Sequence, residues 1–222
     1  MTPIRAKKPL FAVIVTLLVV TVGVGGFFLV RGVSRPSVGD IIEFGGYEWR
    51  VLDVQDGSML IISENVIERR MYHNSRVNEI MWEYSPLRQW LNEDFYNGFT
   101  SLERARILET RIINDDNPWY GTSGGNATND KIFLLSLYEV VQRFGDSGEL
   151  GREDGRWGFS DRYSPNRIAY DMDGNASWWW LRSPGGNNFY AAAVDLSGLI
   201  YVAGIRVFPI YGGVRPALWL NW

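Results

Sequence analysis

The sequence predicts an α+β domain over residues 38–222, behind one N-terminal transmembrane helix over residues 10–30. Two observations predict the class of the domain. Strand-like segments stand at both ends of it with helix-like segments between them, and 24 glycines accompany 10 tryptophans, 11 tyrosines and 11 phenylalanines. Separate runs of strands and helices are typical of α+β folds, and abundant glycine with many aromatic side chains indicates short strands and frequent turns. A third observation, one long uncharged run, predicts the helix.

That run is LFAVIVTLLVVTVGVGGFFLV, from Leu10 to Val30. At about 1.5 Å per residue it reaches the roughly 30 Å of a bilayer core. A cleaved signal peptide is the alternative interpretation, but its apolar region is shorter, and no small-residue cleavage site of the A-x-A kind follows. The sequence therefore favours an anchor in contact with the membrane.

Positive charges on the two sides of the run predict its orientation. Three basic side chains precede it and two follow it closely, and residues 1–37 contain no acid. By the positive-inside rule, residues 1–9 lie in the cytoplasm. Residues 31–37 read as a linker, and residues 38–222 lie outside, so the predicted location is the cell membrane, as a single-pass protein.

The first part of the domain reads as a β-meander. Strands are expected at 40–44, 47–54 and 58–62, because Gly45-Gly46 and Asp56-Gly57 between them are strong hairpin signals. Beyond Ser177 the chain again reads as strand and turn. The final run, Val214 to Leu220, is expected to be a well-covered strand that pairs with an early element, because a frayed end would waste its apolar side chains.

Helix-start signals mark the middle of the chain. Ser85-Pro86 starts one helix, which Asn97-Gly98 ends, and Thr100 and Ser136 each stand three residues before a glutamate, which is the capping-box spacing. The remaining expectations are helices over 100–108 and 136–144, a polar loop over 114–130, a strand over 131–135, and irregular structure over 146–176.

Composition excludes several classes of chemistry. The chain has no cysteine and one histidine, His73, so thiolate sites, disulfides, histidine-based triads and multi-histidine zinc sites are not expected. Of the 22 basic side chains five lie in residues 1–37, which leaves 17 against 25 acids in the domain. A nucleic-acid-binding domain is basic, so no nucleic-acid partner is predicted. We expect no cofactor and no metal site, and Asp171 to Asn175, which resembles half of a calcium loop, is read as a turn.

Five segments carry a resemblance that covers most of residues 40–222. They are SPLRQWLNEDFYNGF (85–99), DDNPWYGTSGG (115–125), DKIFLLSLYEVV (130–141), WWWLRSPG (178–185) and GVRPALWL (213–220). Together they resemble a family of uncharacterised bacterial surface domains. The closing GVRP is similar to the GFR ending of formylglycine-generating-enzyme-like C-type lectin folds, which implies a C-type-lectin-like domain.

The two C-terminal motifs are interpreted as a structural clamp. Successive residues of a strand point to opposite faces, and indole rings favour burial with a partner for the N–H group. Arginine suits stacking on such rings or bridging backbone carbonyls. The clamp is predicted to consist of Trp178, Trp180, Arg182, Gly213 and Arg215.

Between the clamp motifs, residues 185–213 mix scaffold-like glycines and valines with large aromatic and amide side chains. The family that these segments resemble includes variable proteins of diversity-generating retroelements. In those proteins the adenines of asparagine codons are randomised, which gives codons of the form NNY, where N is any base and Y is a pyrimidine. Such codons cannot encode Lys, Glu, Gln, Met or Trp, and none of these occurs in residues 185–213. The segment 187–211 is therefore predicted to hold a ligand-binding face, made of Asn187, Asn188, Phe189, Tyr190, Asp195, Ser197, Tyr201, Arg206, Phe208 and Tyr211.

The function expected from these patterns is a membrane-anchored cell-surface protein that binds a protein or a glycan and is not an enzyme. No catalytic residue is assigned. The formylglycine-generating activity needs cysteines, and the EPN, QPD and WND tripeptides of calcium-dependent lectins are absent. Two alternatives stay open: an envelope enzyme acting on glycans through carboxylates, and a structural envelope protein without a dedicated ligand.

Overall fold

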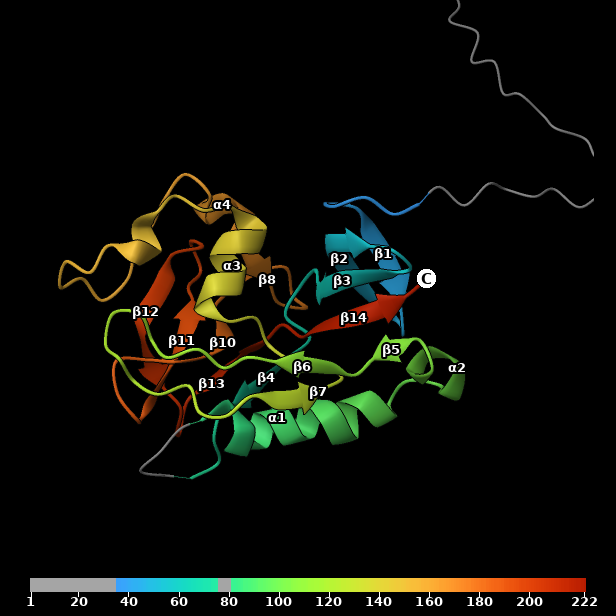
Figure 1. Ribbon diagram of the computed structural model, residues 1–222, viewed down its shortest axis with the longest axis horizontal. Helices are drawn as coiled ribbons and strands as arrows, with labels where there is room; N and C mark the ends of the chain where they lie inside the picture. Colours follow the sequence, from blue (N-terminus) through green and yellow to red (C-terminus); the bar gives the residue numbers. More distant parts are fainter. Residues whose placement is uncertain (1–34, 76–80) are drawn as a thin grey trace, which may run out of the picture. The chain divides into compact units, whose positions relative to one another are not determined.

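Two five-stranded sheets organise residues 35–75 and 81–222, the part of the chain that the computed structural model describes (Figure 1). The first sheet has the order β1-β2-β3-β14-β5, and the second has the order β12-β11-β10-β13-β4. Two two-stranded sheets, β6-β7 and β8-β9, complete the strands. Their bounds are β1 Ile41–Phe44, β2 Tyr47–Gln55, β3 Ser58–Ser63, β4 Glu68–Met71, β5 Ile107–Leu108, β6 Thr110–Ile112, β7 Thr128–Asp130, β8 Ala169–Tyr170, β9 Ala176–Ser177, β10 Trp179–Pro184, β11 Tyr190–Val194, β12 Ile200–Arg206, β13 Tyr211–Val214 and β14 Ala217–Asn221.

The helices are few and short. The longest helical stretch runs from Pro86 through α1 and a π-helical turn, η2, and lies along the lower edge of Figure 1. Helix α3 lies next to α4, on one side of the second sheet. Their bounds are α1 Pro86–Trp90, η2 Leu91–Phe95, α2 Ser101–Arg104, α3 Leu137–Phe144 and α4 Ser164–Arg167, with short 3₁₀ turns η1 Trp82–Tyr84 and η3 Glu149–Gly151.

The predicted α+β class is wrong, and with it the lectin-like α+β architecture behind a transmembrane helix, because the regular secondary structure of the described residues is mostly β-sheet, with few helices. One reason lies after the second helix start. The capping box at Thr100 forms, but α2 ends at Arg104 because Ile107 and Leu108 pair with β14 instead. The expected strand over 131–135 is also wrong. In this segment only Phe133 makes a β-bridge, to Ala217. The Asn92 side chain accepts the Lys131 N–H group and donates to the Ile132 carbonyl.

Local turn and capping signals are confirmed. The first three strands join through the two predicted hairpins, with β1 paired to β2 and β2 to β3. Ser85 caps α1 by accepting a hydrogen bond from the Arg88 N–H group, and Ser136 caps α3 in a capping box with Glu139. These signals depend on neighbours within three residues, which is why the sequence alone shows them.

The predicted anchor and the localisation derived from it are not supported. In the part of the chain that the structure describes, no helix has the length and apolar character needed to cross a membrane. The run over residues 10–30 lies outside the described residues.

One bent ribbon joins the two sheets. In this ribbon, β3 pairs antiparallel with β14 in the first sheet, and β4 pairs antiparallel with β13 in the second (Figure 1). The ribbon bends at Arg215-Pro216, where Ser63 N–H donates to the Pro216 carbonyl at 2.9 Å. The expectation that the final segment pairs with an early strand is confirmed, but the run from Val214 to Leu220 is not one strand, because Val214 ends β13 and Ala217 begins β14.

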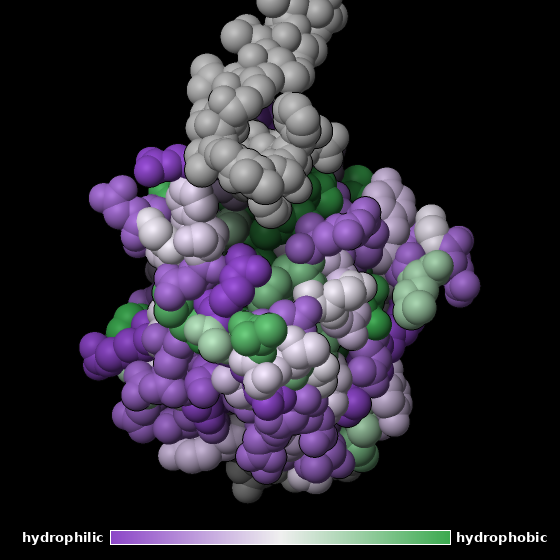
Figure 2. All heavy atoms as spheres, turned by 90° about the vertical axis from the view of Figure 1, so that its right-hand side faces the viewer, coloured by the Kyte–Doolittle hydropathy of each residue, from purple (hydrophilic) through white to green (hydrophobic). Residues whose placement is uncertain are grey.

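A single hydrophobic core runs through both sheets, and Trp49, Trp82, Trp179 and Trp180 are among its largest fully buried side chains. Figure 2 views the domain from the side of β5 and α2, where hydrophilic residues cover most of the surface. Exposed apolar residues such as Leu102 on α2 are scattered among them, which is normal for a folded protein. The candidate site lies elsewhere, on the second sheet.

Candidate functional site

The predicted ligand-binding residues lie on the β11–β12 hairpin and the loops that flank it. Tyr190 stands opposite Arg206 at one end of the hairpin, and Ala193 stands opposite Tyr201 nearer the other end. The hairpin turn is built by Asp195, whose carboxylate accepts the N–H groups of Ser197 and Leu199 at 2.8 and 2.9 Å. Gly198 follows with φ +79°, and an added Cβ would lie 1.8 Å from the Ser164 carbonyl oxygen. Only glycine therefore fits this turn.

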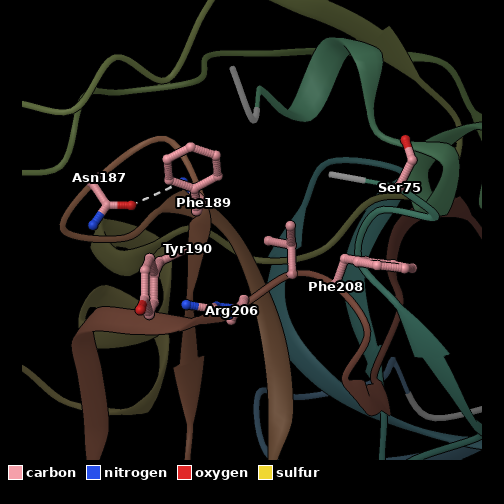
Figure 3. Close-up of a pocket in the computed structure, with 7 residues that line it drawn as sticks. Ser75, Asn187, Phe189, Tyr190, Arg206 and Phe208 are labelled. Atoms are coloured by element: carbon pink, nitrogen blue, oxygen red, sulfur yellow. Dashed lines mark hydrogen bonds between the residues drawn. The ribbon is translucent and has the colours of Figure 1, made fainter. Parts of the chain in front are cut away.

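A hollow of about 410 Å³ opens at the Tyr190–Arg206 end (Figure 3). In Figure 3, Asn187, Phe189, Tyr190 and Arg206 lie on one side of it, and Ser75 and Phe208 lie on the other. The residues that line it are Ser75, Asn187, Phe189, Tyr190, Arg206, Val207 and Phe208. Five of these seven belong to the predicted ligand-binding set, so the fold brings half of that set together.

Hydrogen bonds fix the loop at the rim of the hollow. The Asn187 side-chain oxygen accepts the Phe189 N–H group at 3.0 Å, and the Asn187 carbonyl accepts the Tyr190 N–H group at 3.1 Å. These two bonds form a tight turn that carries the Phe189 ring outward, where 46% of it is exposed. The same bonds leave the side-chain NH₂ group of Asn187 as a donor.

Burial divides residues 185–213 into two classes. None of the ten predicted ligand-binding residues is buried. The glycines and valines read as scaffold are all buried, namely Val194, Gly198, Val202, Gly204 and Val207. Tyr201 and Phe208 are intermediate, because each packs in part against the core. The segment thus has a buried framework and a set of side chains that face outward.

The other half of the predicted set lies away from the hollow. Asp195 and Ser197 form the turn at the opposite end of the hairpin, and Asn188 is exposed without lining the hollow. The Tyr201 ring packs against Trp157, with ring centroids 4.3 Å apart, and 51% of Trp157 is exposed. The face is therefore not one patch.

Tyr211 lines a separate hollow of about 250 Å³ between β4 and α1. It is 57% exposed and pairs with Met71 across the β13–β4 ladder. On the wall of this hollow the Arg70 guanidinium lies over the Trp90 ring, 3.9 Å from its centroid. Arginine on an indole face is a stable cation–π arrangement.

Sequence reasoning missed the contribution of Ser75 to the lining of the hollow, and it missed the contacts of His73, two residues earlier. The single histidine, His73, is buried, and its backbone N–H donates to the Val207 carbonyl. Its ring Nδ1 accepts the Ser75 N–H group at 3.3 Å, and burial lowers the pKa of the ring below its ordinary value. No local signal could have found the contact between His73 and Val207, because these two residues are far apart in the chain.

Asn117 was also missed, and it positions the edge of the site. Its side-chain NH₂ group donates to the carbonyls of Pro184 and Val202, both at 2.8 Å, while its oxygen accepts the Trp119 N–H group at 3.0 Å. It thereby ties the 115–125 loop to the ends of β10 and β12. The asparagine of the NPW sequence is a signal for such a bracket, since asparagine favours bonds to nearby backbone groups.

The predicted clamp residues lie in or against the core. Trp180 is buried and its Nε1–H group donates to the Arg70 carbonyl at 2.9 Å, while Trp178 is half-buried with its ring 4.7 Å from that of Trp180. Gly213 passes so close to this pair that an added Cβ would lie 2.4 Å from the Trp178 carbonyl oxygen. Side chains larger than hydrogen are excluded there.

The two clamp arginines tie different parts of the fold together. Arg182 donates to the carbonyls of Leu134 and Ile113 at 2.8 and 3.0 Å, and it pairs with Glu139 in the capping box of α3. Arg215 sits at the bend of the ribbon and donates to the Ser63 carbonyl at 2.7 Å. Burial lowers the pKa of Arg215 to about 10.

Metal binding finds no support in the described ranges, where no three histidine or acidic side chains gather into a possible ion site. Asp171 accepts the N–H groups of Asp173 and Asn175 at 3.1 and 2.9 Å, so the calcium-like sequence forms a turn.

Comparison with known proteins adds one finding. The model of the family described as "Domain of unknown function (DUF6273)" matches residues 56–222. No curated protein and no solved structure matches the chain. The resemblance to variable proteins of diversity-generating retroelements stays a prediction. Since the family model covers most of the chain, from the turn between β2 and β3 to the C-terminus, the protein belongs to the DUF6273 family.

Proposed function

We propose that the domain is a ligand-binding module and not an enzyme, with its binding site at the hollow between Phe189 and Phe208. The observation that carries the proposal is the division within residues 185–213, where a buried framework holds up ten residues of which none is buried. A surface selected for solubility alone carries lysine and glutamate, whereas this one carries aromatic rings. Outward-facing aromatic clusters of this kind mark interaction sites.

The lining of the hollow favours binding over catalysis. The seven residues that line it include no carboxylate, so the pair of acids that a glycan hydrolase needs is missing from this site. His73 is not among the lining residues, and its Nδ1 accepts the Ser75 backbone N–H group. The volume of about 410 Å³ falls in the range of ordinary ligand sites.

Binding of a protein or glycan is tested with a matched pair of variants. Phe189→Ala removes a ring that is 46% exposed at the hollow, and Tyr138→Ala removes one that is 45% exposed on α3. Both proteins are screened on a glycan array and against whole cells, and their thermal melting is compared. We expect Phe189→Ala to lose binding by about tenfold or more, as hot-spot aromatic residues do, while Tyr138→Ala binds normally. Equal binding by both variants would show that the hollow is not part of the binding surface.

The hypothesis of a diversified face is a separate part of the proposal. It is supported by the absence of the five residue types that NNY codons cannot encode. Sequencing closely related chains tests it. We expect differences to concentrate at exposed positions such as Asn187, Phe189 and Arg206, with Val194 and Gly204 unchanged. Differences spread evenly over residues 38–222 would refute it.

A further inference from the structure

We infer that the ligand of the hollow presents a carboxylate on an apolar body, an inference that rests on the proposed binding function. The first step is the charge of the lining. Arg206 is the only charged residue among the seven that line the hollow. The domain as a whole carries more acids than bases, so a lining with a cation and no acid differs from the rest of the surface.

Arg206 is available to a ligand. It is exposed, and within residues 35–75 and 81–222 it takes part in no ion pair. Its backbone stands opposite Tyr190 at the end of the hairpin, and Figure 3 shows the guanidinium extending toward the Tyr190 ring. A guanidinium without an acidic partner offers two parallel N–H donors, the geometry that a carboxylate accepts.

The uncharged polar groups of the lining favour the same ligand. The Asn187 oxygen is already used by the Phe189 N–H group, which leaves the NH₂ group to donate. Ser75 and Tyr190 add hydroxyl groups, which can also donate. The hollow therefore offers several donors, and its acceptors, the hydroxyl oxygens among them, are all uncharged. An ammonium ligand, which only donates, finds no acceptor with a full charge there, whereas a carboxylate, which only accepts, meets several donors.

The walls define the rest of the ligand. Phe189, Tyr190 and Phe208 contribute three aromatic rings, and Val207 contributes an apolar side chain. Rings on two sides of a space of this size favour a flat or apolar body that packs between them. A carboxylate attached to such a body occurs in a peptide that ends in an aromatic or aliphatic residue, whereas a uronic acid shares the carboxylate but carries it on a hydroxylated ring.

Three probes that share one ring and differ in charge test the inference. They are N-acetylphenylalanine, its primary amide and phenethylamine, each titrated into the domain while amide chemical shifts of Phe189 and Arg206 are followed by NMR. We expect the acid to bind at least tenfold tighter than the amide, with the amine weakest. Glucuronate and glucose, titrated in parallel, show whether an acidic sugar is accepted in place of an amino-acid body.

Variants connect the preference to one side chain. Arg206→Gln is expected to reduce the affinity for the acid to that for the amide, and Arg206→Lys is expected to keep part of the difference. Arg111→Gln removes an exposed arginine on β6 and is expected to change nothing. Raising the salt concentration should weaken the acid more than the amide, because exposed charges are screened.

The outcomes separate this inference from the proposed function. Binding of the amide or the amine as tightly as the acid would overturn the carboxylate inference and leave the hollow as a binding site. Binding of the acid that Arg206→Gln does not alter would also overturn it. Absence of any shift with all five compounds would overturn both the inference and the placement of the binding site in this hollow.

Discussion

The clamp and the outward-facing set both lie within residues 178–215, and both use aromatic side chains and arginine. They use these residue types for opposite purposes. In the clamp, Trp180 and Arg182 are buried and donate to backbone carbonyls of distant segments. On the face, Phe189 and Arg206 are exposed, and Arg206 pairs with no acid in the described part of the chain. An aromatic ring or a guanidinium therefore does not by itself indicate core or surface. What decides is whether the fold supplies a partner.

The largest effect is expected from removing the strands that end the chain. Deleting residues 214–222 takes β14 from between β3 and β5 and removes Arg215 from the bend of the ribbon. We expect the cooperative thermal transition to disappear, as measured by calorimetry. Deleting Trp222 alone is the control and should leave a cooperative transition. A cooperative transition after the longer deletion would show that the first sheet closes without β14.

The next largest effect is expected at the centre of the clamp. Trp180→Ala should lower the free energy of unfolding by about 3–5 kcal/mol, because it leaves a large cavity and removes the hydrogen bond to the Arg70 carbonyl. Denaturant unfolding measures it. Trp157→Ala, at a tryptophan that is 51% exposed, should cost much less. Similar losses at the two tryptophans would erase the contrast between core and face.

A smaller effect is expected in the pH dependence of stability, through His73. Burial lowers the pKa of His73 below the ordinary 6.5, so the unfolded chain takes up this proton at a higher pH than the folded domain does. The contribution of neutral His73 to stability is complete above about pH 6.5 and is lost as the pH falls through the folded-state pKa. Unfolding free energies of the wild type should therefore fall more steeply between pH 7 and pH 5 than those of His73→Gln. Parallel curves would show that the histidine titrates alike in both states.

The smallest effect on stability is expected on the face itself. Phe189→Ala and Arg206→Gln should change the free energy of unfolding by no more than about 0.5 kcal/mol, as is usual for exposed positions. Phe208→Ala should cost more than either, because Phe208 packs in part against the core. Thermal melting of the three variants checks this order. A loss of unfolding free energy in Phe189→Ala as large as that in Trp180→Ala would show that the face belongs to the core.

Short-range signals in the sequence determined much of the local structure. The two glycine hairpins, the serine cap before Pro86 and the capping box at Ser136 all formed, because each depends on backbone groups within a few residues. The division of residues 185–213 into small buried residues and large outward ones could also be anticipated, since glycine and valine alternate there with aromatic and amide side chains.

Only the tertiary structure decided the class of the fold and the shape of the site. Ile107 and Leu108 extend a helical pattern in sequence, yet they pair with β14 because that edge of the first sheet offers backbone partners. Ser75 reaches the hollow because the ribbon places β4 beside β13, and Asn117 supports its edge through carbonyls of β10 and β12. In caps and turns, the backbone groups bond to neighbours along the chain. Sheet edges and cavities are instead formed by segments that are distant in sequence and meet only on folding. A single sequence contains no local pattern that shows which segments will meet.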